Sequence, residues 1–130
     1  FKDFDDPWDR PFMQRIMSAA PRSSTRIGTA LRHSGLRLRR REAKQKLILL
    51  ITDGKPMDAD YDPSSQYAQH DVRMAVIENR RDNIHSFCIS TKENSRADLE
   101  IMFPNNRYII LEDIRQLPRL LPRLYLKLTT

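Results

Sequence analysis

Residues 47–56, LILLITDGKP, constrain the fold more than any other stretch of this sequence. The five consecutive apolar residues Leu47–Ile51 are typical of a strand that is buried on both faces, as in parallel sheets covered by helices. The apolar run stops before Asp53, which the turn-forming tripeptide Gly-Lys-Pro follows. We therefore expect a buried strand whose carboxyl end presents a carboxylate.

Helical and strand patterns alternate along the rest of the chain. The spacing of Ile27, Leu31 and Leu38 predicts a helix over 27–42, and Val72, Ala75 and Val76 predict another near 68–82. The short helix expected over 8–19 would turn Phe12 and Ile16 inward, with Met13 and Met17 beside them. The remaining expected elements are a strand tail at 1–4, a loop at 21–26, strands at 84–90 and 108–111, a helix at 94–102, and a C-terminal helix from about Pro118.

This alternation predicts right-handed crossovers and a doubly wound, mostly parallel α/β sheet. In such sheets ligands bind beyond the carboxyl ends of the strands, near the point where the strand order reverses. Asp53 follows the most apolar strand, so we expect it to lie in that binding region.

The composition fits one domain and excludes several classes of protein. The 130 residues are 39% apolar, and no run approaches the roughly 20 apolar residues of a membrane-spanning helix. A single cysteine rules out a disulfide framework and suits a reducing compartment, so we expect a cytoplasmic protein. Residues 37–46 are basic whereas 1–9 and 58–62 are acidic, and no aromatic residue lies between 26 and 60. This mixed charge favours protein partners over nucleic acid.

Three kinds of aspartate site fit poorly around Asp53. A Walker B aspartate needs a glycine-rich phosphate loop, and none of the three glycines forms one. A phosphoacceptor of the receiver type, the alternative function we consider, fits the residues just after Asp53 but needs an upstream acidic pair. The pair Asp5-Asp6 is a poor candidate because a proline follows it. An EF-hand loop starting at Asp58 fails, because its sixth and twelfth positions are Pro63 and Gln69.

A divalent-cation site fits better. Thr25 in SSTRIGTALRH and Asp53 in LLITDGKP resemble two of the three parts of the metal-ion-dependent adhesion site of von Willebrand factor A domains. The resemblance implies that a threonine hydroxyl and a carboxylate hold Mg²⁺, or Mn²⁺ or Ca²⁺, directly or through water, as hard cations prefer. One coordination position would remain for a carboxylate of a partner protein. No bond is broken at such a site, so we expect a docking module and not an enzyme.

Several stretches of the sequence resemble one bacterial branch of that family, the NorD/CbbO-type proteins. This resemblance implies that the protein acts with a MoxR-type AAA+ ATPase to activate a client metalloenzyme, such as nitric oxide reductase or Rubisco, without entering a membrane. The stretches that carry it are TRIGTALRH (25–33), LILLITDGKPMDAD (47–60), DVRMAVIENRRDNIHSFCIS (71–90) and LPRLLPRLYLKLT (117–129).

One part of the family pattern is absent from the sequence. The site also needs Asp-x-Ser-x-Ser at the end of the first strand, which does not occur in these residues. By the family order, residues 1–130 form a single partial A domain, from the end of the third strand to the C-terminal helix. We then expect weak or no metal binding by this chain alone. We also expect an unpaired edge on the strand at 47–51, which invites self-association.

Simpler explanations exist for each of these residues. Thr25 could be a helix N-cap and Asp53 a turn residue. The acidic run 58–62 is expected to be a solvated loop at the rim of the site. Cys88 is expected in the core, and the histidines have no nucleophile partner for a catalytic triad. Trp8 is either core or part of a surface that faces a partner.

Overall fold

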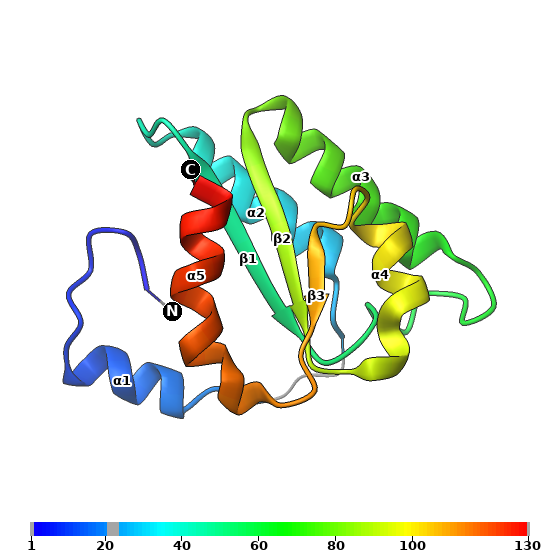
Figure 1. Ribbon diagram of the computed structural model, residues 1–130, viewed down its shortest axis with the longest axis horizontal. Coiled ribbons are helices and arrows are strands. Elements are labelled where there is room, and N and C mark those ends of the chain that lie inside the picture. The colour runs from blue at the N-terminus through cyan, green and yellow to red at the C-terminus, as the bar shows by residue number, and fades with distance from the viewer. Residues whose placement is uncertain (1, 21–23, 130) are drawn as a thin grey trace.

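The computed structural model describes residues 2–20 and 24–129, and it shows helices and strands in alternation (Figure 1). The fold class expected from the sequence is confirmed. In chain order the elements are α1 (Arg10–Met17), α2 (Ile27–Arg39), β1 (Lys46–Thr52), α3 (Tyr67–Arg81), β2 (Ile84–Ser90), a 3₁₀ turn (Glu93–Ser95), α4 (Arg96–Met102), β3 (Tyr108–Ile110), a second 3₁₀ turn (Ile114–Gln116) and α5 (Leu117–Thr129).

The three strands form one parallel sheet in the order β1-β2-β3. Lys46–Thr52 pairs residue for residue with Ile84–Ser90, and β3 pairs with the last three residues of β2. Because all pairings are parallel, the carboxyl ends of the three strands lie at the same edge of the sheet. The loops that follow the strands are therefore brought close together.

Helices cover both faces of the sheet, as a doubly wound fold requires (Figure 1). One face packs against α2, α3 and α4, and the other against α5. Alternate residues of β2 point to opposite faces, so Cys88 belongs to the first core and Phe87 and Ile89 to the second. The first core contains Ile27, Leu31, Val72, Ala75, Val76, Cys88, Leu99, Met102 and Phe103, and the second contains Phe87, Ile89, Leu111 and Leu124.

Strand β1 is less buried than the sequence suggests. Its residues are half-buried and Ile51 is 48% exposed, whereas every residue of β2 except His85 is buried. The expectation that Leu47–Ile51 is buried on both faces is therefore wrong for the part of the chain that the structure describes. The physical reason is that β1 pairs only with β2 among these residues, so its other edge is unpaired, as the sequence predicts.

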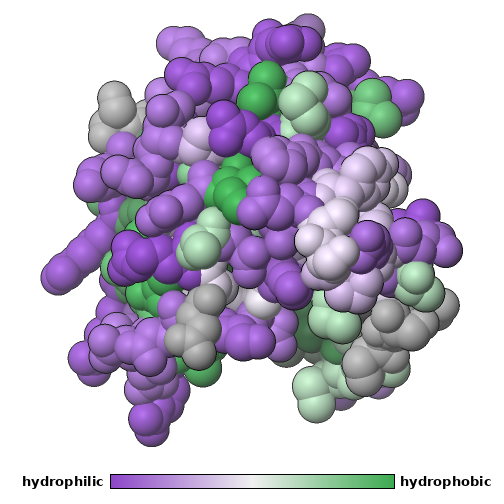
Figure 2. Space-filling view, turned by 90° about the vertical axis from the view of Figure 1, so that its right-hand side faces the viewer, coloured by the Kyte–Doolittle hydropathy of each residue, from purple (hydrophilic) through white to green (hydrophobic). Residues whose placement is uncertain are grey.

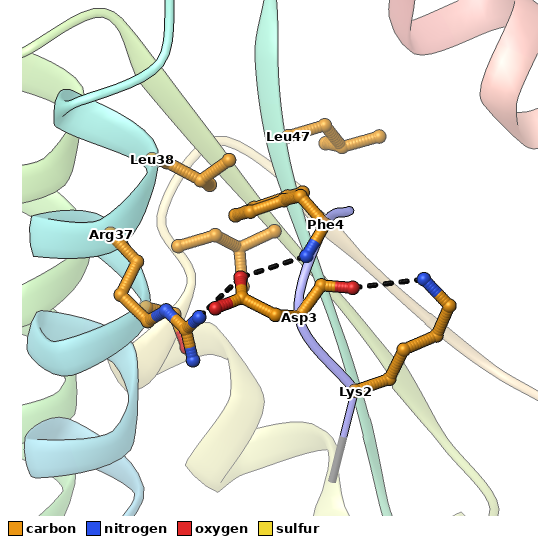
Figure 3. Close-up of a pocket in the computed structure, with 8 residues that line it drawn as sticks. Lys2, Asp3, Phe4, Arg37, Leu38 and Leu47 are labelled. Carbon is orange, nitrogen blue, oxygen red and sulfur yellow. Dashed lines mark hydrogen bonds and ion pairs between the residues drawn. The ribbon is translucent and has the colours of Figure 1, made fainter. Parts of the chain in front are cut away.

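The N-terminal segment differs from its expected structure. Residues 2–4 are not in a strand, and position 1 lies outside the described residues. Figure 3 shows Phe4 lying near Leu38 and Leu47, and Asp3 forming an ion pair with Arg37 of α2. These side chains line a pocket of about 440 Å³ between the segment, α2 and β1. This segment is therefore held by side-chain contacts with α2 and not by pairing in the sheet.

Helix α1 buries only one of its four expected core residues. Asp9 caps it by accepting a hydrogen bond from the Phe12 amide at 2.9 Å. Phe12 is buried, but the side chains of Met13, Ile16 and Met17 are exposed. The expectation that these three face inward is wrong, because the short helix lies at the periphery of the fold and turns only one face to it (Figure 1).

Helix α2 ends at Arg39, earlier than the predicted Glu42. Helices α2 and α3 are held together by polar contacts as well as by the core. Arg32 donates to Asp71 at 2.8 Å and to Glu78 at 2.7 Å.

The outer face over α3 and α4 is largely hydrophilic, with apolar residues scattered over it (Figure 2). No helix among residues 2–20 and 24–129 is long and apolar enough to cross a membrane.

Candidate functional site

Thr25 and Asp53 line one pocket of about 680 Å³ at the carboxyl edge of the sheet. The two residues are far apart in the chain, and a backbone bridge between Thr25 and Met57 joins their segments. The end of β1, the residue after β2 and the segment that begins two residues after β3 all contribute to this pocket. The lining residues are Thr25, Ile51, Thr52, Asp53, Thr91, Glu112, Asp113 and Ile114.

Asp53 is the first residue after β1, as the sequence predicts. Its carboxylate is exposed and receives no hydrogen bond from the described part of the chain. The preceding Thr52 closes the turn instead: its hydroxyl donates to the Gly54 carbonyl at 3.0 Å and accepts from the Gly54 amide at 3.3 Å. The Thr91 amide donates to the Thr52 carbonyl at 3.0 Å and extends the pairing of β1 with β2. The strand end is thus fixed while the Asp53 carboxylate faces solvent.

Thr25 is held by its backbone, which leaves its side chain available. Its amide donates to the Met57 carbonyl at 2.6 Å, and the Met57 amide donates back to the Thr25 carbonyl at 3.3 Å. The N-cap position of α2 is Arg26, with no side-chain cap bond, so the simpler explanation of Thr25 as the N-cap is wrong. The Thr25 hydroxyl makes no hydrogen bond with the described residues.

The acidic run 58–62 is not uniformly solvated, which corrects the expectation from the sequence. The Asp58 side chain is only 3% exposed and pairs with Arg26 at 2.6 Å. Hydrogen bonds from the Arg26 guanidinium hold the pKa of Asp58 well below its usual range. Asp60 is 79% exposed but also contacts Arg26, and Asp62 accepts from the Ser64 amide and hydroxyl. The run forms a structured loop against the start of α2.

The pocket contains two further acidic residues that the sequence did not indicate. Glu112 and Asp113 follow β3, and both line the pocket that contains Asp53. Asp113 caps the second 3₁₀ turn and pairs with Arg115 at 2.9 Å, and these hydrogen bonds lower the pKa of Asp113. The signal for these residues was their place directly after a predicted strand. Ile51 and Ile114, each 48% exposed, add apolar surface to the same pocket.

The donors in this pocket fit a divalent cation in kind but not in number. A hydroxyl and an exposed carboxylate are ligands that Mg²⁺ accepts. However, residues 2–20 and 24–129 contain no group of three histidine, cysteine, aspartate or glutamate side chains that could hold a metal ion. A hard cation held by Thr25 and Asp53 would therefore require further oxygen ligands.

The single cysteine of the sequence is a core residue. Cys88 is fully buried at the centre of β2, and burial raises the pKa of its thiol to about 12. Its thiolate form is therefore scarce at neutral pH, and the expectation of a core cysteine is confirmed. His33 and His70 are exposed, and His85 is half-buried.

Comparisons with known proteins agree with the α/β fold described above. The chain matches the von Willebrand factor type A domain over residues 10–123. It is 33% identical over 124 residues to Protein NorD of Brucella suis, covering 95% of this chain and 19% of that protein. It is 35% identical over 115 residues to Protein NorD of Stutzerimonas stutzeri, covering 88% of this chain and 19% of that protein. An uncharacterised protein of Pseudomonas aeruginosa is 34% identical over 128 residues, covering 98% of this chain and 21% of that protein.

The chain thus spans about a fifth of the length of the curated relatives it matches. No solved structure matches it significantly.

Proposed function

The chain belongs to the von Willebrand factor type A domain family, and we propose that it is a non-enzymatic protein-interaction module that docks partners at the carboxyl edge of its sheet. The observation that carries this proposal is the meeting of Thr25 and Asp53 in one pocket. Both side chains keep their oxygen atoms available, while backbone contacts fix the segments around them. A site prepared in this way suits binding better than bond-breaking chemistry.

We propose further that Thr25 and Asp53 hold Mg²⁺, together with oxygen ligands from beyond the described residues. When bound, the cation would supply an electrostatic anchor for a carboxylate of the partner. The exposed side chains of Ile51 and Ile114 would pack against apolar groups that flank the carboxylate. Docking would then combine a directional ionic contact with the burial of apolar surface.

We propose that the partners are those of a NorD-like accessory protein. The support is the similarity to relatives named NorD over 95% of this chain. The partners would be a MoxR-type AAA+ ATPase and a client metalloenzyme, such as nitric oxide reductase, in the cytoplasm. The domain would then link the ATPase to the enzyme that it activates.

Calorimetric titration with Mg²⁺ and Mn²⁺ tests the metal site. The titration compares this chain with a longer protein that also carries an Asp-x-Ser-x-Ser strand. We expect measurable binding by the longer protein, and loss of that binding in Asp53→Asn and Thr25→Ala. Matched controls are Glu42→Gln and Thr29→Ala, which change an exposed acidic residue and an exposed threonine outside the pocket; both should bind as the unmodified protein does.

Binding that survives both Asp53→Asn and Thr25→Ala would place the metal elsewhere. Absence of binding by every protein would remove the metal from the mechanism, and the partner contacts would then be metal-independent. Labelling by acetyl phosphate that depends on Asp53 would favour the receiver-type alternative. Each outcome therefore distinguishes one use of Asp53 from the others.

A further inference from the structure

Arg26 and Asp58 connect the two segments that carry the candidate ligands. Arg26 follows Thr25 in the chain, and Asp58 lies in the loop that begins at Asp53. The Arg26 Nε donates to Asp58 Oδ2 at 2.6 Å, and Nη2 donates to Asp58 Oδ1 at 2.8 Å. Two parallel charged hydrogen bonds of this kind fix both distance and orientation, whereas a single contact does not.

Arg26 contacts two acidic residues, Asp58 and Asp60, which differ in burial. Nη2 of Arg26 also donates to Asp60 Oδ2 at 2.6 Å, but the Asp60 side chain is 79% exposed and that of Asp58 is 3% exposed. An exposed ion pair contributes little, because water screens it. A buried carboxylate that loses its partner is left uncompensated, which is costly. Asp58 is therefore the residue that anchors Arg26.

A backbone bridge lies directly beside this ion pair. Thr25 and Met57 exchange two backbone hydrogen bonds, and each is the chain neighbour of one member of the pair. Residues 25–26 are thus joined to residues 57–58 by main chain and side chain together. Only three residues separate Asp53 from Met57, and one of them, Pro56, is buried. These contacts limit how far Thr25 can move relative to Asp53.

We propose that the Arg26–Asp58 ion pair is a positioning device that holds Thr25 at a fixed place relative to Asp53. Neither Arg26 nor Asp58 lines the pocket, so they act through their neighbours and not by contact with a ligand. This proposal rests on the proposed function of the pocket as a binding site. The benefit of the ion pair is preorganisation. Thr25 and Asp53 are already in place before the cation and the partner bind, so binding does not have to order them.

The test uses Asp58→Asn, with Asp60→Asn as the matched control. Asp58→Asn removes the charge from the buried partner of Arg26, and Asp60→Asn removes it from the exposed one. Arg26→Lys is the second variant, since it keeps the positive charge but loses the planar fork. All variants are made in the longer protein that carries the Asp-x-Ser-x-Ser strand, and their thermal unfolding is recorded so that only folded proteins are compared.

Two measurements are made on each protein. Amide hydrogen exchange at Thr25 and Met57, without metal, reports the bridge, and Mn²⁺ titration reports the assembled site. We expect Asp58→Asn and Arg26→Lys to speed exchange at both amides and to weaken Mn²⁺ binding by about tenfold or more, since small displacements of positioned groups have large effects. Asp60→Asn should change both quantities by less than about twofold, as expected of a screened surface contact.

The outcomes separate this proposal from the function on which it rests. Unchanged exchange in Asp58→Asn, or faster exchange with unchanged Mn²⁺ affinity, overturns the positioning role alone, provided that Asp53→Asn still abolishes binding. Absence of Mn²⁺ binding by the unmodified longer protein overturns the proposed metal site and the positioning role together. Loss of affinity in Asp58→Asn and Arg26→Lys, but not in Asp60→Asn, supports both.

Discussion

The side-chain amide of Asn79 on α3 fills the space that a methyl group on Gly35 of α2 would need. A Cβ atom at Gly35 would lie 1.9 Å from Asn79 Oδ1, far inside van der Waals contact. Asn79 cannot easily move, because it is buried and its Nδ2 donates to the Leu31 carbonyl at 3.0 Å. The close approach of α2 and α3 therefore depends on a glycine at position 35.

We expect Gly35→Ala to lower the free energy of unfolding by about 1–3 kcal/mol, since an overpacked site must displace a fixed neighbour. The measurement is a urea unfolding curve. Gly54→Ala is the control, because a Cβ there would meet only Lys92 Cδ at 4.0 Å. Equal stability of the two variants would show that the helices can separate without cost.

Helix α5 should stabilise the sheet mainly through Leu124. Leu124 is 8% exposed and packs in the core on that face, whereas Leu126 on the same helix is 60% exposed. Leu124→Ala should cost about 2–5 kcal/mol, as truncation of a buried leucine does, and Leu126→Ala much less. Differential scanning calorimetry would record both. Similar losses in the two variants would contradict the packing of α5 described above.

The free energy of unfolding should decrease as the pH drops below neutrality, because of His85. Burial, followed by the charges of Arg107 and Arg80, lowers the pKa of His85 from its ordinary value of 6.5. The unfolded chain then binds more protons than the folded one below about pH 6.5, so the stabilising contribution is present above that pH and lost as the pH falls. Urea midpoints at pH 7.5 and 5.5 should differ less in His85→Gln than in the unmodified chain. The exposed His33 serves as control, and a similar effect of His33→Gln would argue against burial as the cause.

The unpaired edge of β1 should make this chain self-associate. An exposed strand edge offers backbone groups to another chain, and charged side chains at such an edge oppose pairing. We expect the mass seen by light scattering to rise with concentration, and to rise less in Ile51→Lys. Ile114→Lys is the matched control, because Ile114 is equally exposed but lies outside the strands. A monodisperse monomer at all concentrations would contradict this prediction.

The sequence predicted the elements best where periodicity and burial agree. The strand over 84–90 and the inward residues Val72, Ala75 and Val76 were found because their neighbours in the fold lie on this chain. The burial of β1 was overestimated. An apolar run indicates that a strand is suited to burial, but it does not show which elements lie beside the strand. Helix α1 failed for a related reason: Met13 and Met17 have suitable spacing but no packed surface opposite them.

The sequence indicated two residues of the candidate site but not the contacts that hold them in place. Thr25 and Asp53 lie in recognisable sequence patterns, and both line one pocket. The Arg26–Asp58 pair joins residues 32 positions apart, and no local pattern in either segment indicates such a contact. Glu112 and Asp113 were missed because an acidic pair after a strand resembles an ordinary turn until the sheet order is known.

The order of the strands across the sheet, which matches their order along the chain, has a consequence for how the protein is made. A ribosome releases β1 first, then β2, then β3. Each later strand can therefore dock onto a neighbour that has already emerged, and neither β2 nor β3 waits for a strand still to be synthesised. Assembly of this part of the sheet can follow translation directly. Limited proteolysis of stalled nascent chains should show protection of α2, β1, α3 and β2 before that of β3 and α5.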